Sequence, residues 1–161
     1  MAAITKKDGV LLLKLQALYD IEKTLEKALP KLAKASFDKG LRAGFESHLQ
    51  ETKGHVKRLE AIFKEMDAKP KTEKSEGIRG IVADSEWVMK NQPSGLLRDA
   101  MLAAGARYAE HYEMAGYMSA IEEAKVLKMP KVAQALQANL KEEVAADKIL
   151  AGAVKAALKY A

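Results

Sequence analysis

The stretch that decides the fold is Leu11-Leu-Leu-Lys-Leu-Gln-Ala-Leu-Tyr-Asp-Ile-Glu-Lys-Thr-Leu-Glu-Lys-Ala-Leu29, in which leucines recur at alternating three- and four-residue steps. That spacing places the leucines on one stripe of an α-helix. Position 22 of the same stripe is a glutamate, where an apolar residue is expected. The stretch therefore predicts an amphipathic helix with a carboxylate on its buried face.

Four long helices are expected from this spacing along the chain. The first contains Pro30, which predicts a kink or a break there. The expected helices cover residues 8–36, 41–66, 96–127 and 131–160.

The connection between the second and third long helices is unusually long. Residues 67–95 include the linker-like Lys69-Pro-Lys71 and the helix breaker Asn91-Gln-Pro-Ser-Gly95, with one short helix expected over residues 78–90. A connection of this length can cross the whole bundle, as in ferritin-like folds. The sequence predicts an all-α fold, a ferritin-like four-helix bundle with a long crossover containing a short extra helix, in a single domain over residues 1–161.

Composition narrows the functional class. The absence of cysteine excludes disulfides and thiolate metal sites. The N-terminal segment lacks the features of a signal peptide, no stretch is apolar enough to span a membrane, and a cytoplasmic location is expected. The net charge is +5, but lysine and arginine alternate with acids instead of gathering on one face, so no nucleic-acid partner is predicted.

Three of the long helices carry acids on their apolar stripes. Glu22 lies on the first, Glu113 on the third, and both Glu143 and Asp147 on the fourth. An ionised carboxylate taken out of water costs several kcal/mol unless a partner compensates it. Two divalent cations would neutralise four such acids, and oxygen ligands with an occasional imidazole suit iron or manganese.

The second long helix is less regular. Its central stripe position is Thr52, with His48 and His55 just to one side and Glu51 further round the helix. Glu110 of the third helix also lies off the stripe centre. Glu51 and Glu110 therefore remain candidates for either ligands or surface acids. His55 is included among the predicted ligands, with a supporting or solvent-facing role as the alternative, whereas His48 is expected only to hydrogen-bond.

The two helical hairpins repeat a similar layout. Each has an acid on its first helix, then an acid and a second ligand candidate four residues later on the next helix. Glu22 corresponds to Glu113, 91 residues later. Two further pairs are each 92 residues apart: Glu51 with Glu143, and His55 with Asp147. Four tyrosines lie near these acids in the sequence; we expect one to hydrogen-bond a ligand and the others to pack: Tyr19, Tyr108, Tyr112 and Tyr117.

The sequence resembles the bacterial YciE/YciF family of ferritin-like proteins. The matching stretches are Leu18-Tyr-Asp-Ile-Glu-Lys23, Ala28-Leu-Pro-Lys-Leu-Ala33, His48-Leu-Gln-Glu-Thr-Lys-Gly-His55, Glu110-His-Tyr-Glu-Met-Ala115 and Leu140-Lys-Glu-Glu-Val-Ala-Ala-Asp147. The resemblance implies a bundle related to rubrerythrin and bacterioferritin, a homodimer and a role in stress responses. The resemblance also implies that six acids are metal ligands: Glu22, Glu51, Glu110, Glu113, Glu143 and Asp147.

Two functions follow as hypotheses. The first is a di-iron protein, with manganese as the alternative metal, in which oxygen or peroxide reacts in an oxidase, peroxidase or iron-handling role. The second is a non-enzymatic bundle that acts through self-association or a protein partner. The second gains support from Gly54 and Ala146, which occupy the positions where the ferritin motif Glu-x-x-His has its histidine.

Overall fold

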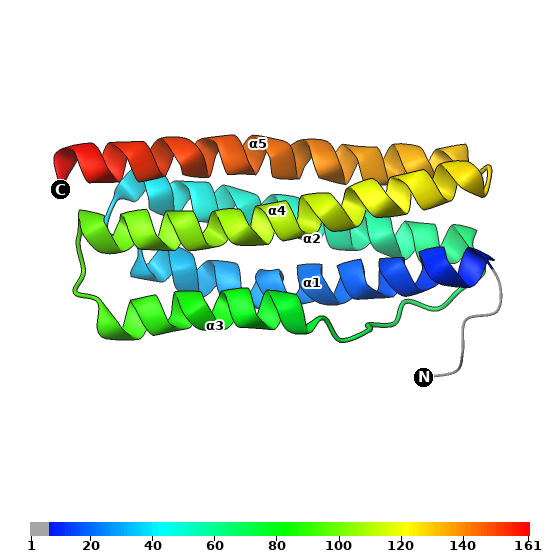
Figure 1. The fold of residues 1–161 in the computed structure, drawn as a ribbon, viewed down its shortest axis with the longest axis horizontal. Helices are drawn as coiled ribbons and strands as arrows, with labels where there is room; N and C mark the ends of the chain where they lie inside the picture. Colours follow the sequence, from blue (N-terminus) through cyan, green and yellow to red (C-terminus); the bar gives the residue numbers. More distant parts are fainter. Residues whose placement is uncertain (1–6) are drawn as a thin grey trace.

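The computed structural model describes residues 7–161, which form five α-helices and no strand (Figure 1). Their bounds are α1 Lys7–Ala35, α2 Lys39–Glu65, α3 Glu76–Asn91, α4 Leu96–Val126 and α5 Pro130–Tyr160. The all-α prediction is confirmed, and the expected helix ends agree within two residues. No helix in this part of the chain is long and apolar enough to cross a membrane. The expectation that the N-terminal segment is not a signal peptide falls partly on residues 1–6, which lie outside the described residues.

The four long helices form two hairpins. α1 packs along α2, α4 packs along α5, and the hairpins meet where α1 contacts α4 and α2 contacts α5. α2 ends and α4 begins at opposite ends of the molecule (Figure 1). The segment between them therefore returns along the length of the molecule, and its helix α3 packs against α4 and α1.

α1 continues through Pro30 without a break, so of the kink or break predicted there the break is wrong. Proline lacks the N–H that would bond the carbonyl four residues earlier. Pro30 lies on the exposed face of α1, where water can satisfy that carbonyl, while its neighbours Leu29 and Leu32 are buried in the core. Burial of the leucine stripe on both sides holds the helix together.

Buried aspartates tie the connections to the long helices. Asp99, in the first turn of α4, accepts hydrogen bonds from the N–H groups of Phe37 at 2.9 Å and Asp38 at 2.7 Å. Asp20 of α1 accepts from the N–H of Ser75 at 2.9 Å and from the guanidinium of Arg79 at 2.5 Å. The hydrogen bonds from Arg79 hold the pKa of Asp20 below its usual value. The turn between α1 and α2 is thereby tied to the start of α4, and the start of α3 is tied to α1.

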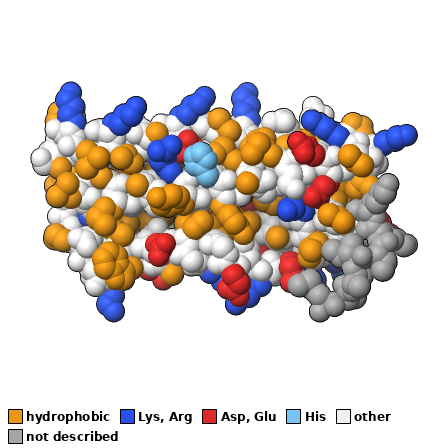
Figure 2. Space-filling model, viewed as in Figure 1, with side chains coloured by type: hydrophobic (Ala, Val, Ile, Leu, Met, Phe, Trp, Pro, Cys, Tyr) orange, Lys and Arg blue, Asp and Glu red, His pale blue; other side chains and the backbone are white. Residues whose placement is uncertain are grey.

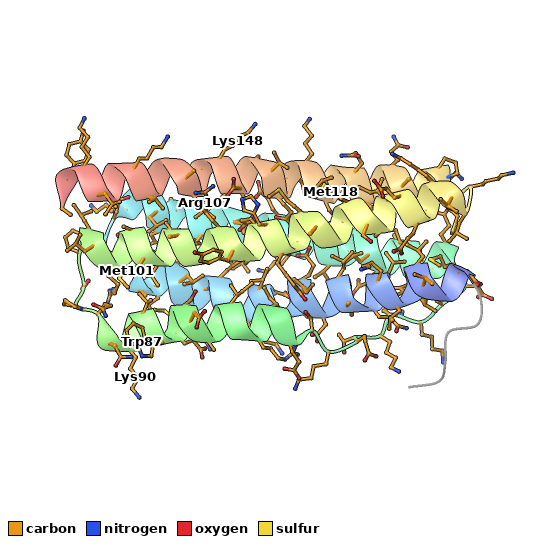
Figure 3. The ribbon with its side chains drawn as sticks, in the orientation of Figure 1. Trp87, Lys90, Met101, Arg107, Met118 and Lys148 are labelled. Carbon is orange, nitrogen blue, oxygen red and sulfur yellow. The ribbon has the colours of Figure 1, made fainter. Side chains whose placement is uncertain are left out.

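The outer face of α4 is notably apolar. Figure 2 shows hydrophobic side chains gathered along the middle of the face formed by α3, α4 and α5. Met101 and Met118 of α4 and Trp87 of α3 are labelled in the same orientation in Figure 3, and all three are exposed. This surface contrasts with the acidic interior described next.

Candidate metal centre

Six ionisable side chains meet in the middle of the molecule. Glu22 comes from α1, His48 and His55 from α2, Glu110 and Glu113 from α4, and Glu143 from α5. Glu22, Glu113, Glu143 and His55 are 0% exposed, and the other two are almost as deeply buried. We call this group the acid–histidine cluster: Glu22, His48, His55, Glu110, Glu113 and Glu143.

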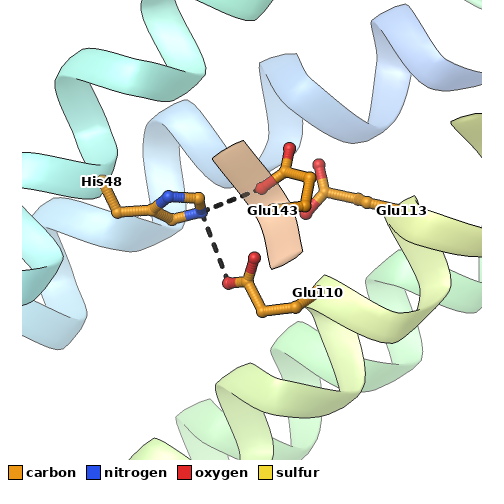
Figure 4. Close-up of side chains that lie close together, drawn as sticks. All are labelled: His48, Glu110, Glu113 and Glu143. Atoms are coloured by element: carbon orange, nitrogen blue, oxygen red, sulfur yellow. Dashed lines mark ion pairs between the residues drawn. The ribbon is translucent and has the colours of Figure 1, made fainter. Parts of the chain in front are cut away.

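The first part of the cluster surrounds His48 (Figure 4). Its Nε2 lies 3.3 Å from Glu110 Oε1 and 3.7 Å from Glu143 Oε2. With Glu113, these residues offer four ligand atoms within 4.8 Å of one another. The other ring nitrogen of His48, Nδ1, lies 3.2 Å from Glu51 Oε2, which orients the ring.

The second part surrounds His55. Its Nδ1 lies 3.2 Å from Glu22 Oε1 and 2.9 Å from Glu143 Oε1, and these three residues again offer ligand atoms within 4.8 Å. The Nε2 of His55 hydrogen-bonds Glu142 Oε2 at 2.7 Å. Glu143 belongs to both parts, with one oxygen toward each histidine.

A hydrogen-bonded chain links the second part to the surface. The hydroxyl of Tyr117 donates to Glu22 Oε1 and accepts from Asn139 Nδ2 at 2.9 Å. Arg58 donates to Asn139 Oδ1 at 2.5 Å and to Glu142 at 2.7 and 2.8 Å. Glu22 is therefore fixed by groups on two other helices.

Much of the cluster's hydrogen-bonding capacity is unused. Most of its close contacts lack hydrogen-bond alignment, so within residues 7–161 many buried atoms have no partner. They are Glu22 Oε2, Glu110 Oε2, both carboxylate oxygens of Glu113 and of Glu143, His48 Nε2, His55 Nδ1 and, between the histidines, Thr52 Oγ1. Buried polar atoms are normally satisfied, so such a concentration requires an explanation.

Burial and mutual repulsion raise the pKa values of three carboxyl groups of the cluster, those of Glu22, Glu110 and Glu113. The pKa of Glu113 lies well above its usual value because of burial and then the charges of Glu143 and Glu22. Burial also raises the pKa of Glu22. It raises the pKa of Glu110 well above the usual range, although the charge of His48 opposes this shift. Burial therefore favours the protonated form of these three acids.

Burial acts on the histidines in the opposite sense, but their pKa values are also raised. Burial alone would lower the pKa of His48, but the hydrogen bond to Glu51 and the charges of Glu110 and Glu143 outweigh it and raise the pKa to about 9. Burial is likewise outweighed at His55, where Glu143 and Glu22 raise the pKa to about 11. Both rings therefore carry a positive charge at neutral pH when no other cation is present.

The donor set fits divalent cations. Unpartnered carboxylate oxygens and ring nitrogens converge in two groups, and oxygen-rich sites with imidazole suit iron and manganese. Within the described residues, no lysine or arginine pairs with Glu22, Glu113 or Glu143, which would have been the alternative way to compensate their charge. His48, Glu110, Glu113 and Glu143 can hold one ion, and Glu22, His55 and Glu143 another.

Comparison with known proteins places the chain in a family. Residues 6–160 match the family described as "Domain of unknown function (DUF892)". The chain belongs to the DUF892 family. Protein YciF of Escherichia coli (strain K12) is 35% identical over 130 residues, which cover 80% of this chain and 78% of that protein. The resemblance seen in the sequence is confirmed.

Solved structures agree with this assignment. The crystal structure of the E. coli stress protein YciF matches with a TM-score of 0.92 and 31% identity, over 97% of this chain and 99% of that one. YcfI of Rhodopseudomonas palustris, described as a candidate structural protein, matches with a TM-score of 0.88 and 32% identity, over 91% and 94%. A Xanthomonas campestris protein shares the fold, with a TM-score of 0.73 and 18% identity over 96% and 94%.

The cluster of this DUF892 protein includes five of the seven predicted ligands. Glu22, His55, Glu110, Glu113 and Glu143 lie together in the middle of the molecule. Glu51 lies at the edge with 42% of its side chain exposed, and it contacts the cluster only through His48.

Asp147 lies outside the cluster. Its carboxylate accepts from Arg107 Nε at 2.7 Å and lies 3.3 Å from His111 Nε2. Arg107 is labelled beside α5 in Figure 3. The hydrogen bond from Arg107 lowers the pKa of Asp147, so this acid is already neutralised by a partner on α4.

The two hairpins are consequently less alike than their spacing indicates. Glu143 is fully buried whereas its expected counterpart Glu51 is half-exposed, and His55 is fully buried whereas Asp147 pairs with arginine. A separation of 91 residues relates the two halves better. It matches Glu22 with Glu113, buried Thr52 with buried Glu143, and half-exposed Glu51 with Glu142.

Sequence reasoning gave too little weight to three residues. His48 is seven residues, almost two helical turns, before His55, so the two rings share one face of α2. That spacing is the signal that could have placed His48 in the site. Asn139 and Glu142 reach the cluster only through partners on other helices, and nothing in their local sequence indicates this.

Proposed function

We propose that this protein is a ferritin-like metal protein that binds two divalent ions, iron or manganese, in the acid–histidine cluster. The observation that carries the proposal is the group of buried carboxylate and imidazole atoms that have no hydrogen-bond partner in the described chain. Cations would satisfy these atoms and offset the cost of burying the carboxylates, several kcal/mol each. Both effects favour the ionised acids that a metal needs.

The surrounding residues support this role by fixing the proposed ligands. Glu51 holds His48 through Nδ1 and leaves Nε2 facing the acids. Glu142 holds His55 through Nε2 and leaves Nδ1 facing Glu22 and Glu143. Partners of this kind set the orientation of a ligand and the ring nitrogen that binds. Bound iron would supply one-electron redox chemistry, in an oxidase, peroxidase or iron-handling role.

The arrangement of the helices supports the ferritin-like assignment. α2 and α4 run in the same direction, so a long crossover that includes α3 joins the two hairpins (Figure 1). Such a crossover is typical of ferritin-like bundles, whose metal ligands project inward from all four helices. We infer a stress-related role from the similarity to YciF, which is described as a stress protein.

Metal analysis of designed variants tests the proposal. Protein reconstituted without oxygen with Fe²⁺ or Mn²⁺ should bind about two ions per chain. Glu143→Gln should weaken both sites because Glu143 belongs to both groups, whereas His48→Ala should remove only one ion. Asp147→Asn is the matched control, since this acid pairs with Arg107 and should leave the stoichiometry unchanged. Wild-type protein that binds neither metal would contradict the proposal.

A second candidate function, self-association as a homodimer or with a protein partner, is favoured by the outer face of α4. Leu97, Met101, Tyr108 and Met118 lie on one face of this helix and are all exposed. Contiguous exposed apolar patches commonly mark interaction sites. Light scattering should give the mass of a dimer for the wild type and of a monomer for a Met101→Glu, Met118→Glu variant. A monomeric wild-type protein would contradict self-association.

A further inference from the structure

A narrow apolar pocket leads from the surface of the molecule to the first part of the acid–histidine cluster. It lies between α1, α3 and α4 and encloses about 450 Å³, including its open mouth. Only about 20 Å³ of this space accommodates the centre of a water-sized molecule, so the pocket admits one small molecule at a time.

The walls of the pocket are almost entirely hydrocarbon. Each of the three helices contributes apolar side chains: Leu25 and Leu29 from α1, Val82 and Met89 from α3, and Ala106 and Ala109 from α4. Water gains few hydrogen bonds between such walls, and an ion would lose its hydration shell without replacement. The pocket therefore favours a small uncharged, apolar solute.

The two ends of the pocket are polar. At the inner end, His48 and Glu110 line it, and both belong to the acid–histidine cluster. At the outer end, Lys31 of α1 pairs with Glu86 of α3 at 2.8 Å, and both side chains are about half exposed. The pocket thus runs from a surface ion pair, beneath α3, to the proposed ligands.

The opposite side of His48 faces a different opening. A groove between α2 and α5 encloses about 810 Å³ and is lined by His48, the carboxylate of Glu51 and small residues such as Gly44. This groove is wider than the pocket beneath α3, and its mainly apolar lining includes the polar side chains of Asp38, Ser47, His48 and Glu51. The cluster is therefore approached by a narrow, almost wholly apolar pocket and by a wider groove with polar side chains in its wall.

We propose that the pocket beneath α3 is the route by which dioxygen, a small apolar molecule, reaches the acid–histidine cluster. This inference rests on the proposed metal-binding function for its destination, while the pocket itself is independent of any metal. α3, the helix of the crossover, then has a function beyond connection: it forms the outer wall of the dioxygen path.

Xenon tests the pocket without any metal. Crystals of metal-free protein under xenon pressure should show xenon between α1, α3 and α4, because xenon is uncharged and occupies apolar cavities. Val82→Phe should fill the pocket and abolish this density. Val88→Phe is the matched control, since Val88 is another half-buried valine of α3 that does not line the pocket. Wild-type crystals without xenon at this position would overturn the proposal.

The rate of dioxygen entry tests the route. In protein loaded with Fe²⁺, Val82→Phe should slow oxidation by dioxygen about tenfold, equivalent to a barrier higher by about 1.4 kcal/mol. Iron stoichiometry should stay unchanged, and Val88→Phe should oxidise like the wild type. The route is overturned if Val82→Phe oxidises at the wild-type rate, or if Gly44→Val, in the other groove, is the variant that slows it. Failure to bind iron at all would instead refute the proposed function, and the xenon result would still decide whether the pocket admits an apolar molecule.

Discussion

Tyr117 shows how a single side chain organises the cluster. Its ring is fully buried, its hydroxyl donates to Glu22 and accepts from Asn139, and burial followed by the charge of Glu22 raises its pKa well above the usual value. The hydroxyl therefore stays protonated and acts as a permanent donor to Glu22. Of the four tyrosines near the acids, it is the one that hydrogen-bonds a predicted ligand.

Replacing Tyr117 with phenylalanine should destabilise the protein by about 1–3 kcal/mol. The change leaves the amide of Asn139 without its acceptor and removes one donor from Glu22, and buried polar groups without partners carry costs of this size. Urea unfolding of the metal-free protein measures the effect. Tyr108→Phe, at a side chain that is 70% exposed, is the control and should change stability by less than about 0.5 kcal/mol. Equal effects of the two changes would show that the hydroxyl of Tyr117 contributes nothing.

At the scale of elements, α3 depends on close packing against α4. A Cβ built on Gly77, in the first turn of α3, would lie 2.7 Å from Cζ and the hydroxyl oxygen of Tyr112. The same hydroxyl lies 3.0 Å from Ser75 Oγ, beside the hydrogen bond that the N–H of Ser75 donates to Asp20. A side chain at position 77 would therefore force the ring of Tyr112 to move from its place beside the start of α3.

Two alanine substitutions on α3 should have opposite effects. Gly77→Ala should destabilise the protein by about 1–3 kcal/mol because the added methyl group overlaps the ring of Tyr112. Gly80→Ala should stabilise it by about 0.5–1 kcal/mol, because its Cβ meets no atom within 4 Å and alanine favours the helix. Urea unfolding of both variants gives the comparison. Adding Tyr112→Ala to Gly77→Ala should yield a non-additive recovery, and strict additivity would argue against the overlap.

For the whole molecule, the buried charges make stability depend on pH. Carboxyl groups with raised pKa values bind more protons in the native state than in the unfolded state, so stability falls as pH rises. The raised pKa of His48 acts in the same direction. The contribution of His48 to stability is complete below pH 6.5, the pKa of histidine in the unfolded chain, and it is lost as the pH rises through about 9, the pKa of His48 in the folded protein.

The metal-free protein should therefore be less stable at pH 9 than at pH 6.5, and a bound metal should reduce the difference. Cations replace the protons, so Mn²⁺ added without air should stabilise more at the higher pH, by about 2.7 kcal/mol at one hundred times its dissociation constant. Thermal unfolding with Mn²⁺ or with a chelator measures both quantities. Asp147→Asn removes an ion pair outside the cluster, so it should show the same pH and Mn²⁺ differences as the wild type even where its overall stability is lower. An Mn²⁺ effect that is absent, or greater at pH 6.5, would contradict a metal site at these acids.

The sequence by itself determined the helices and the acids buried between them. Apolar periodicity is a local property, so Leu11 to Leu32 predicted a buried stripe, and Glu22, Glu113 and Glu143 stood out because they interrupt such stripes. The choice between a kink and a break at Pro30 could not be made from the sequence, because the burial of its neighbours depends on other helices.

The tertiary structure alone decided which acids share one site. Asp147 lies on a predicted stripe but is paired with Arg107, which is 40 residues away and reaches it only when α4 packs on α5. Glu110 and His48 lie beside their stripes yet enter the cluster. The direction of a side chain within a helix follows from sequence periodicity, but its partners depend on how the helices rotate against one another, and that rotation is set by packing over the whole core.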